Sequence, residues 1–99
     1  MVSLDTTDRG TLEKIIEHGI EKIPTLLQSF RTQETKARFQ IINPEEFCYG
    51  HIHGRIFAEF AAHYVITHGK NMSDDEVTEV GEVLERRSKD IKIAIFNCG

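Results

Sequence analysis

The chain has no tryptophan, only two cysteines and two prolines, and no long run of apolar residues. A membrane-spanning helix needs roughly 20 consecutive apolar residues, so we expect no membrane partner. The polar, acidic segment 1–9 lacks the basic start and apolar middle of a secretory signal peptide. Cys48 and Cys98 are too few for a disulfide framework, and we expect two free thiols in the reducing cytoplasm.

Basic residues are also scarce, with 12 Lys and Arg against 16 Asp and Glu and a net charge of -4. A protein that binds DNA or RNA usually presents a basic face to the phosphates. The one short cluster, Arg86, Arg87 and Lys89, falls towards the end of an expected helix, where cations complement the helix dipole. We therefore expect no nucleic-acid partner.

The chain does contain enough apolar sequence for one core. Its 99 residues match the commonest size of a single domain. The content of 39% hydrophobic and 28% charged residues is typical of a globular protein. A chain of this length folds without the help of a metal or a disulfide. We predict a single helical domain over residues 1–99.

Apolar residues recur every three or four positions in the first third of the chain, which predicts a helix beginning near Asp8 and Thr11. Pro24 interrupts the pattern, so either the helix kinks there or a second helix begins with Pro24 in its first turn. The apolar positions stay in phase and should face one core: Leu12, Ile15, Ile16, Ile20, Ile23, Leu26, Leu27 and Phe30.

Segment 31–42 is compatible with a helix or a strand. Ala37, Phe39 and Ile41 alternate with polar residues, as in a half-buried strand. We favour a helix, because the only available partner strand is 91–96 and an isolated two-stranded ribbon is marginally stable. The predicted fold is all-α, a small bundle of about four helices. The alternative is α+β, with a short ribbon from residues 36–42 and 91–96.

Two further helices have clear start signals. Asn43 followed by Pro44 predicts the start of a long helix, which should run to His68 and end at Gly69. Ser73 with Glu76 three residues later is a capping box. The helix that follows should reach about Phe96, because its apolar stripe stays in phase that far: Val77, Val80, Gly81, Leu84, Ser88, Ile91 and Ile95.

The helix expected from 44 to 68 holds four of the five histidines and one of the two cysteines. Placing its residues at intervals of about 100° separates an apolar side from a polar side. Residues four apart on the polar side are neighbours and can interact. The apolar side comprises Phe47, Gly50, Gly54, Phe57, Phe60, Ala61, Tyr64 and Val65, and the polar side comprises Cys48, His51, Arg55, Glu59 and His63.

The thiol and imidazole groups on the polar side suggest a metal site, with Cys48 and His51 as candidate ligands. Two physical arguments oppose it. Arg55 places a positive charge among the ligands, and His51 lies roughly 18 Å from His63 along the helix axis. We therefore favour a solvated face on which Arg55 pairs with Glu59, and we expect no cofactor.

A small-ligand site is a second interpretation of this helix. His53 falls on the apolar side near Phe57 and Tyr64, where an imidazole must find a hydrogen-bond partner or lose its charge. Such a group can bind a ligand, although a structural histidine is the commoner outcome. The candidate ligand-binding residues are His53, Arg55, Glu59 and Tyr64.

Gly50 and Gly54 form a Gly-x-x-x-Gly pair that Ala58 and Ala61 extend into a surface of low relief. A glycine inside a helix costs about 1 kcal/mol relative to alanine, so a pair of them predicts that something packs closely. We expect a helix of the same chain or the same helix of a second chain. Gly50, Gly54, Ala58 and Ala61 are therefore candidate interface residues.

The function that these patterns favour is a protein–protein interaction or assembly module that forms a homo-oligomer, rather than an enzyme. Apolar residues outside the regular stripes support an interface if they are exposed together: Phe39, Ile52, Ile66, Ile93 and Phe96. The alternative is a small-ligand or metal-binding protein that uses the histidine-rich central helix. No arrangement typical of a catalytic nucleophile is present in the sequence.

Overall fold

The helix boundaries coincide with side chains that cap them. Asp5 accepts a hydrogen bond from the backbone N–H of Asp8 at 2.7 Å, and Thr32 accepts one from Thr35 at 3.2 Å. These oxygens satisfy donors that the first helical turn leaves unpaired. The computed structural model describes residues 4–98, which form four helices: α1 (Thr6–Phe30), α2 (Gln33–Phe39), α3 (Pro44–His68) and α4 (Asp74–Phe96).

The predicted start and stop signals of α3 and α4 are confirmed. Asn43 accepts a hydrogen bond from the backbone N–H of Glu46 at 3.1 Å. α3 ends at Gly69, which adopts the left-handed conformation with φ 69°. Glycine reaches this conformation without the steric cost that a Cβ imposes. Ser73 and Glu76 form the capping box at the start of α4.

The all-α fold is confirmed and the α+β alternative is wrong, because residues 4–98 contain no strand and segment 31–42 holds α2. α1 begins at Thr6, slightly before the expected start, and continues through Pro24 to Phe30. No second helix starts at Pro24. Its ring is exposed on the surface of α1, where the residues around it keep the same buried face.

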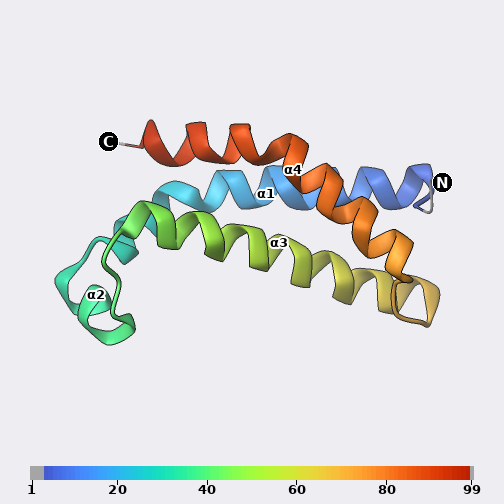
Figure 1. Cartoon of the computed structure of the whole chain (residues 1–99), viewed down its shortest axis with the longest axis horizontal. Helices are drawn as coiled ribbons and strands as arrows, with labels where there is room; N and C mark the ends of the chain where they lie inside the picture. Colours follow the sequence, from blue (N-terminus) through green and yellow to red (C-terminus); the bar gives the residue numbers. More distant parts are fainter. Residues whose placement is uncertain (1–3, 99) are drawn as a thin grey trace.

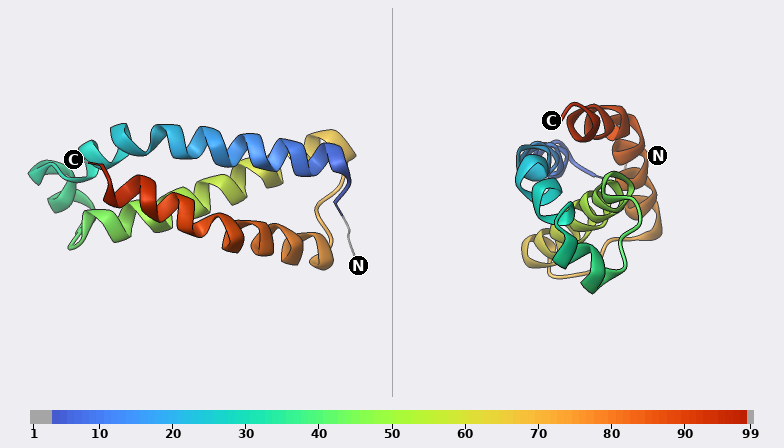
Figure 2. Two further views of the ribbon diagram at one scale, coloured as in Figure 1. Left: turned by 90° about the horizontal axis from the view of Figure 1, so that it is seen from above. Right: turned by 90° about the vertical axis from the view of Figure 1, so that its left-hand side faces the viewer.

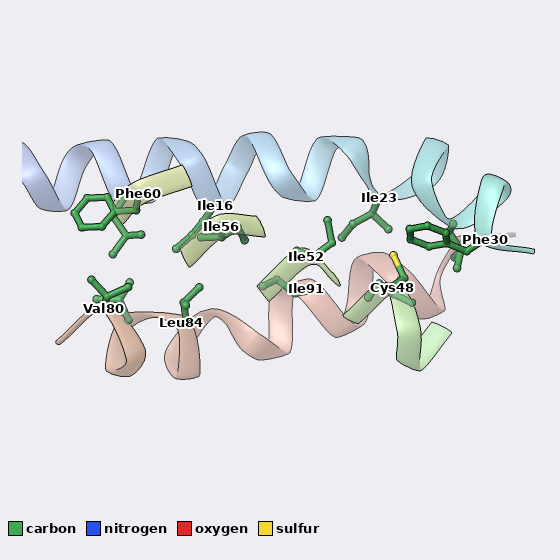
Figure 3. Close-up of a cluster of buried hydrophobic side chains, with 14 of the residues drawn as sticks. Ile16, Ile23, Phe30, Cys48, Ile52, Ile56, Phe60, Val80, Leu84 and Ile91 are labelled. Atoms are coloured by element: carbon green, nitrogen blue, oxygen red, sulfur yellow. The ribbon is translucent and has the colours of Figure 1, made fainter. Parts of the chain in front are cut away.

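The buried apolar side chains form one cluster between the three long helices (Figure 3). α1 contributes the predicted stripe, including Leu12, Ile16 and Ile23, which are completely buried. A fully buried side chain of this size contributes about 1.5–3 kcal/mol relative to an exposed one, so this cluster supplies the main stabilising contribution. α4 contributes Val80, Val83, Leu84, Ile91 and Ile95.

α1, α3 and α4 lie side by side along the long axis of a molecule that measures 44 × 24 × 18 Å (Figure 1). α4 crosses the pair formed by α1 and α3, and α2 lies beyond the ends of the long helices (Figure 2). α2 contributes no buried residue. None of the helices within residues 4–98 is long and apolar enough to cross a membrane.

Candidate functional site

α3 is one continuous helix, as predicted, and it faces the core through a line of residues at four-residue spacing. Ile52, Ile56 and Phe60 occupy the middle of this line and point between α1 and α4 (Figure 3). A spacing of four drifts slowly round a helix of 3.6 residues per turn, so the buried line winds gradually along α3. The complete core line is Cys48, Ile52, Ile56, Phe60 and Tyr64.

The predicted division of α3 into sides is wrong in part. Phe60 and Tyr64 are buried as expected, and Arg55 and Glu59 are partly exposed. Cys48, expected on the polar side, is completely buried. Gly50, Gly54 and Val65, expected on the apolar side, are exposed. The reason is that α3 carries apolar residues round most of its circumference, so residue type alone does not identify the buried line.

The polar residues of α3 at four-residue spacing do meet solvent, and we call them the polar ladder: His51, Arg55, Glu59 and His63. Arg55 Nε lies 3.7 Å from Glu59 Oε1, and the two side chains are 37% and 45% exposed. An exposed pair of this kind contributes less than about 1 kcal/mol. At one end of the ladder, the ring of His51 contacts the ring of Phe30 in α1 with centroids 5.3 Å apart. The ladder therefore borders the seam between α3 and α1.

Part of the ladder lines a groove between α1 and α3. Glu59 and His63 form one wall, and Lys14 and His18 of α1 belong to the other. The groove has a volume of about 390 Å³ and is open to solvent. Its remaining lining residues are Thr11 and Ile15. The sequence placed Glu59 and His63 on a common face, but it gave no sign that His18 lies opposite them.

The candidate metal ligands are not brought together. Cys48 faces the core, whereas His51 is exposed on a neighbouring side of α3. No group of three or more His, Cys, Asp or Glu residues within the described part of the chain could hold a metal ion. Cys48 and His51 therefore lack the further ligands that a tetrahedral site requires.

His53 is half-buried on the side of α3 where Tyr49 lies beneath Lys92 of α4. Its ring packs against Tyr49 with centroids 4.4 Å apart, and its Nε2 is shielded from solvent without a hydrogen-bond partner. Burial lowers the pKa of His53, because a protonated ring would lose hydration. His53 and Tyr64 do not form one site, since eleven residues of helix place them about 16 Å apart along the axis.

Tyr64 instead belongs to a polar cluster that sequence reasoning missed. Its hydroxyl donates a hydrogen bond to Glu76 Oε2 of α4. Its ring packs against the ring of His68 with centroids 4.2 Å apart, and His68 Nε2 lies 3.0 Å from Asp8 Oδ1 of α1. The cluster consists of Asp8, Tyr64, His68 and Glu76, and it links the three long helices at one end of the molecule.

The hydrogen bond in this cluster shifts the pKa values of both partners. The bond to Glu76, and then burial, raises the pKa of Tyr64 to about 12. The same bond, together with the backbone N–H of Ser73, lowers the pKa of Glu76. The neutral phenol and the ionised carboxylate are therefore the stable forms. Their arrangement gives the cluster a structural role, because each polar group is occupied by another.

An ion pair between α1 and α4 lies beside this cluster. Arg9 of α1 contacts Glu79 of α4, with Nη2 at 2.6 Å from Oε2. The backbone N–H of Leu4 donates to Glu79 Oε1 at 3.2 Å. Asp8, Glu76 and Glu79 are the buried charged residues of the described chain, and all of them lie at this end. Their sequence positions show no common spacing, so only the fold reveals the cluster.

The glycines of α3 are not used for packing within the chain. A Cβ placed on Gly50 or Gly54 would meet no atom within 4 Å, and Ala58 is also exposed. Ala61 is half-buried. Of the two partners expected, another helix of the same chain is therefore not found at Gly50 or Gly54 within the described residues.

The close approach within the chain occurs at Gly19 of α1, which sequence reasoning missed. A Cβ on Gly19 would lie 3.3 Å from both Cγ1 and Cδ1 of Ile56. Gly19 is buried in the face of α1 that also carries Ile16 and Ile23. Its position in that stripe, three residues after Ile16, is the signal that could have identified it.

The exposed apolar residues largely follow the prediction. Phe39, Ile66, Ile93 and Phe96 are between 48% and 84% exposed, whereas Ile52 is buried in the core line. Ile42 is 98% exposed, which the sequence did not indicate.

Comparisons with models of protein families, with curated protein sequences and with solved structures find no match for this chain.

Proposed function

We propose that the protein is an assembly module that self-associates through the side of α3 turned away from the core. This outward face has the same four-residue spacing as the core line and lies opposite to it along the helix. All of its residues are exposed. The outward face consists of Gly50, Gly54, Ala58, Ala62 and Ile66.

The observation that carries this proposal is the open space around the two glycines. Each costs about 1 kcal/mol relative to alanine inside a helix, and nothing within the described chain lies close enough to require the absence of a side chain at Gly50 or Gly54. A second copy of the chain supplies a reason, because glycine lets two helix backbones approach closely.

The size gradient along the outward face favours an antiparallel pair of α3 helices. The face has no side chain at Gly50 and Gly54, single methyl groups at Ala58 and Ala62, and a large side chain at Ile66, which is 84% exposed. An antiparallel pair that crosses near Ala58 places Ile66 of each copy against Gly50 of the other. A parallel pair would place the two Ile66 side chains together and leave a gap at the glycines.

The charges beside the outward face favour the same arrangement. Arg55 and Glu59 flank the face on one side. In an antiparallel pair related by a two-fold axis, the same flank of each helix meets its copy. Arg55 of one copy then approaches Glu59 of the other, and the contact occurs twice. Such flanking charges select the orientation of paired helices.

The test compares two glycines that have equally open surroundings. Gly54→Gln adds a polar, helix-favouring side chain to the outward face, and Gly81→Gln adds it to an exposed position of α4 where a Cβ also meets nothing within 4 Å. Sedimentation velocity should give a dimer for the original protein and for Gly81→Gln, and a monomer for Gly54→Gln. A monomeric original protein, or equal behaviour of the two variants, would refute the proposal.

Charge reversal tests the orientation separately. Arg55→Glu and Glu59→Arg each place like charges opposite one another across the two-fold axis and should each weaken the dimer at least about fivefold, given about 1 kcal/mol per lost pair. The double variant restores opposite charges and should recover the original affinity. If the double variant binds as weakly as the sum of the two single effects predicts, with no recovery of dimer affinity, the antiparallel arrangement is excluded.

The groove between α1 and α3 favours a second candidate function, the binding of a small anion. Lys14, His18 and His63 line it, and Glu59 is already paired with Arg55. An anion such as phosphate should bind between these side chains, which offer the Lys14 ammonium group and the ring N–H groups of the two histidines. Titration with phosphate, followed by the NMR signals of the His18 and His63 rings, tests this; unchanged signals at pH 6 would exclude it.

A further inference from the structure

The two cysteines of the chain lie at the same end of the molecule, although they are fifty residues apart in the sequence. Cys48 is completely buried near the start of α3. Cys98 follows the end of α4, is half-buried, and packs against the core cluster to which Cys48 belongs. Both are free thiols.

Arg31 connects the helix turns that carry the two thiols. Its Nε lies 3.2 Å from Glu45 Oε2, three residues before Cys48, and its Nη2 lies 3.5 Å from the backbone oxygen of Cys98. One guanidinium therefore contacts the first turn of α3 and the segment after α4. The end of α4 and the start of α3 lie at the same end of the molecule (Figure 2), and Arg31 connects them there.

The two thiols differ in their access to solvent. Cys98 lines a hollow of about 370 Å³ together with Pro24, Gln28 and Arg31. This volume is sufficient for part of a small peptide reagent to reach the sulfur. Cys48, in contrast, is completely buried.

The pKa of Cys48, like its burial, favours Cys98 as the first thiol to react. Burial raises the pKa of Cys48, and the negative charge that Cys98 would carry as a thiolate raises it further. The contacts of Arg31 with Glu45 and with the backbone of Cys98, rather than this shift, place the two thiols at one end of the core. Since the thiolate is the nucleophile, both the raised pKa and the complete burial of Cys48 disfavour its reacting first.

We infer that Cys98 is a site of reversible thiol oxidation and that Cys48 is its resolving cysteine. The Cys98 thiolate attacks one sulfur of a low-molecular-weight disulfide such as oxidised glutathione, forms a mixed disulfide and releases one glutathione thiolate. The Cys48 thiolate then attacks the Cys98 sulfur and releases the second glutathione thiolate. The two cysteine protons pass to the released thiolates, and the two electrons pass from the cysteines to the reagent.

The bond joins the first turns of α3 to the end of α4 and closes a loop of about fifty residues. A disulfide across a loop of this length stabilises a fold mainly by restricting the unfolded chain. Oxidation should therefore raise the Tm by roughly 10 °C.

The test treats the native full-length protein with oxidised glutathione and measures the products by intact mass and by nonreducing electrophoresis. The expected product of the original protein is a monomer that has lost the mass of two hydrogens and melts at a higher temperature. Cys48→Ala should instead accumulate one glutathione on Cys98. Cys98→Ser should remain unmodified while it is folded.

Other outcomes would overturn the inference. If the original protein also stops at one bound glutathione, Cys48 does not resolve the mixed disulfide. If it forms disulfide-linked dimers, Cys98 reacts with a second chain. Cys48→Ala leaves a cavity in the core and loses stability for that reason alone. Cys98→Ser changes a residue outside α4, so this variant remains folded and keeps the test informative. A Cys98→Ser protein that takes up glutathione while folded would refute the assigned order.

Discussion

The two ends of the bundle are stabilised by different means. At the end where α3 stops and α4 begins, buried polar groups bond across three helices through Asp8, Tyr64, His68 and Glu76. At the opposite end, where α2 lies, Arg31 contacts Glu45 and the backbone oxygen of Cys98, both thiols lie nearby, and several large apolar side chains are exposed. We call these the polar end and the thiol end.

This difference indicates how the helices are held in one alignment along their axes. Apolar packing is non-directional, so the core line of α3 alone would tolerate sliding along α1. A directional bond such as Tyr64 to Glu76 holds only in one alignment. Removing one partner of a buried hydrogen bond is costly, because the other group is left unsatisfied. The hydrogen bonds of the polar end therefore help to fix the alignment, together with Arg87 of α4, which bonds to Glu13 and Glu17 of α1.

Among changes to hydrogen-bonding groups, the largest effect should come from Tyr64→Phe at the polar end. It removes the donor to Glu76 and leaves a buried carboxylate with fewer hydrogen bonds, so the free energy of unfolding should fall by about 2 kcal/mol. Urea denaturation measures the change. Tyr49→Phe is the matched control near the thiol end, and it should change the value by less than about 0.5 kcal/mol. Equal losses at the two positions would remove the distinction between the ends.

The part of this stabilisation that depends on pH should be smaller. The pKa of Glu76 is lowered in the fold, so its contribution is present above the unfolded value of 4.5 and is lost as the pH falls through the folded value. The pKa of Tyr64 is raised from 10.0 to about 12, so its contribution is present below pH 10 and is lost as the pH rises towards 12.

Urea midpoints measured across the pH range test these directions. The original protein should lose stability at both extremes, and Tyr64→Phe should show a weaker dependence on pH in both ranges. A variant whose pH profile is parallel to that of the original protein would show that other groups cause the titration.

A still smaller effect is expected at the thiol end from Arg31→Ala. The pair with Glu45 is partly exposed, at 37% and 28% for the two side chains, so its loss should lower the free energy of unfolding by at most about 1 kcal/mol. The same variant should let Cys98 react faster with a thiol reagent, because the bond to its backbone oxygen is lost. An unchanged reaction rate would contradict the role of Arg31 at this end.

The smallest effect should come from Ile42→Ser. Its side chain is 98% exposed, and the substitution should change stability by less than about 0.5 kcal/mol. Ile41→Ser, one residue earlier, removes a side chain that is only 8% exposed and should cost at least about 2 kcal/mol. Thermal unfolding of the two variants compares them directly, and similar melting temperatures would mean that Ile42 is covered.

Helix positions were predictable because their signals are local. Asn43, Gly69 and the Ser73–Glu76 capping box act within one turn, and the structure has them where the sequence predicts them. The stripe of α1 was also predictable, since its apolar residues occupy one side. α3 was harder, because its apolar residues occupy several sides and the choice among them depends on what α1 and α4 present.

The polar cluster could not be predicted from the sequence, because its members are up to sixty-eight positions apart and share no spacing. Tyr64 was singled out as a candidate ligand-binding residue near His53, but its hydroxyl bonds to Glu76 of α4. Glu76 was assigned only to the capping box, and it serves in both contacts through different oxygens. A residue that satisfies one local motif gives no sign of a second, distant role.

Gly19 and Ile56 share one volume between α1 and α3. A Cβ on Gly19 would touch the outer atoms of Ile56. A larger residue at position 19 therefore requires a smaller residue at position 56. The two positions are therefore expected to vary together over evolution, with alanine at 19 accompanied by valine at 56. Such a paired exchange, seen in a distantly related chain, would identify this helix pair even where the rest of the sequence has diverged.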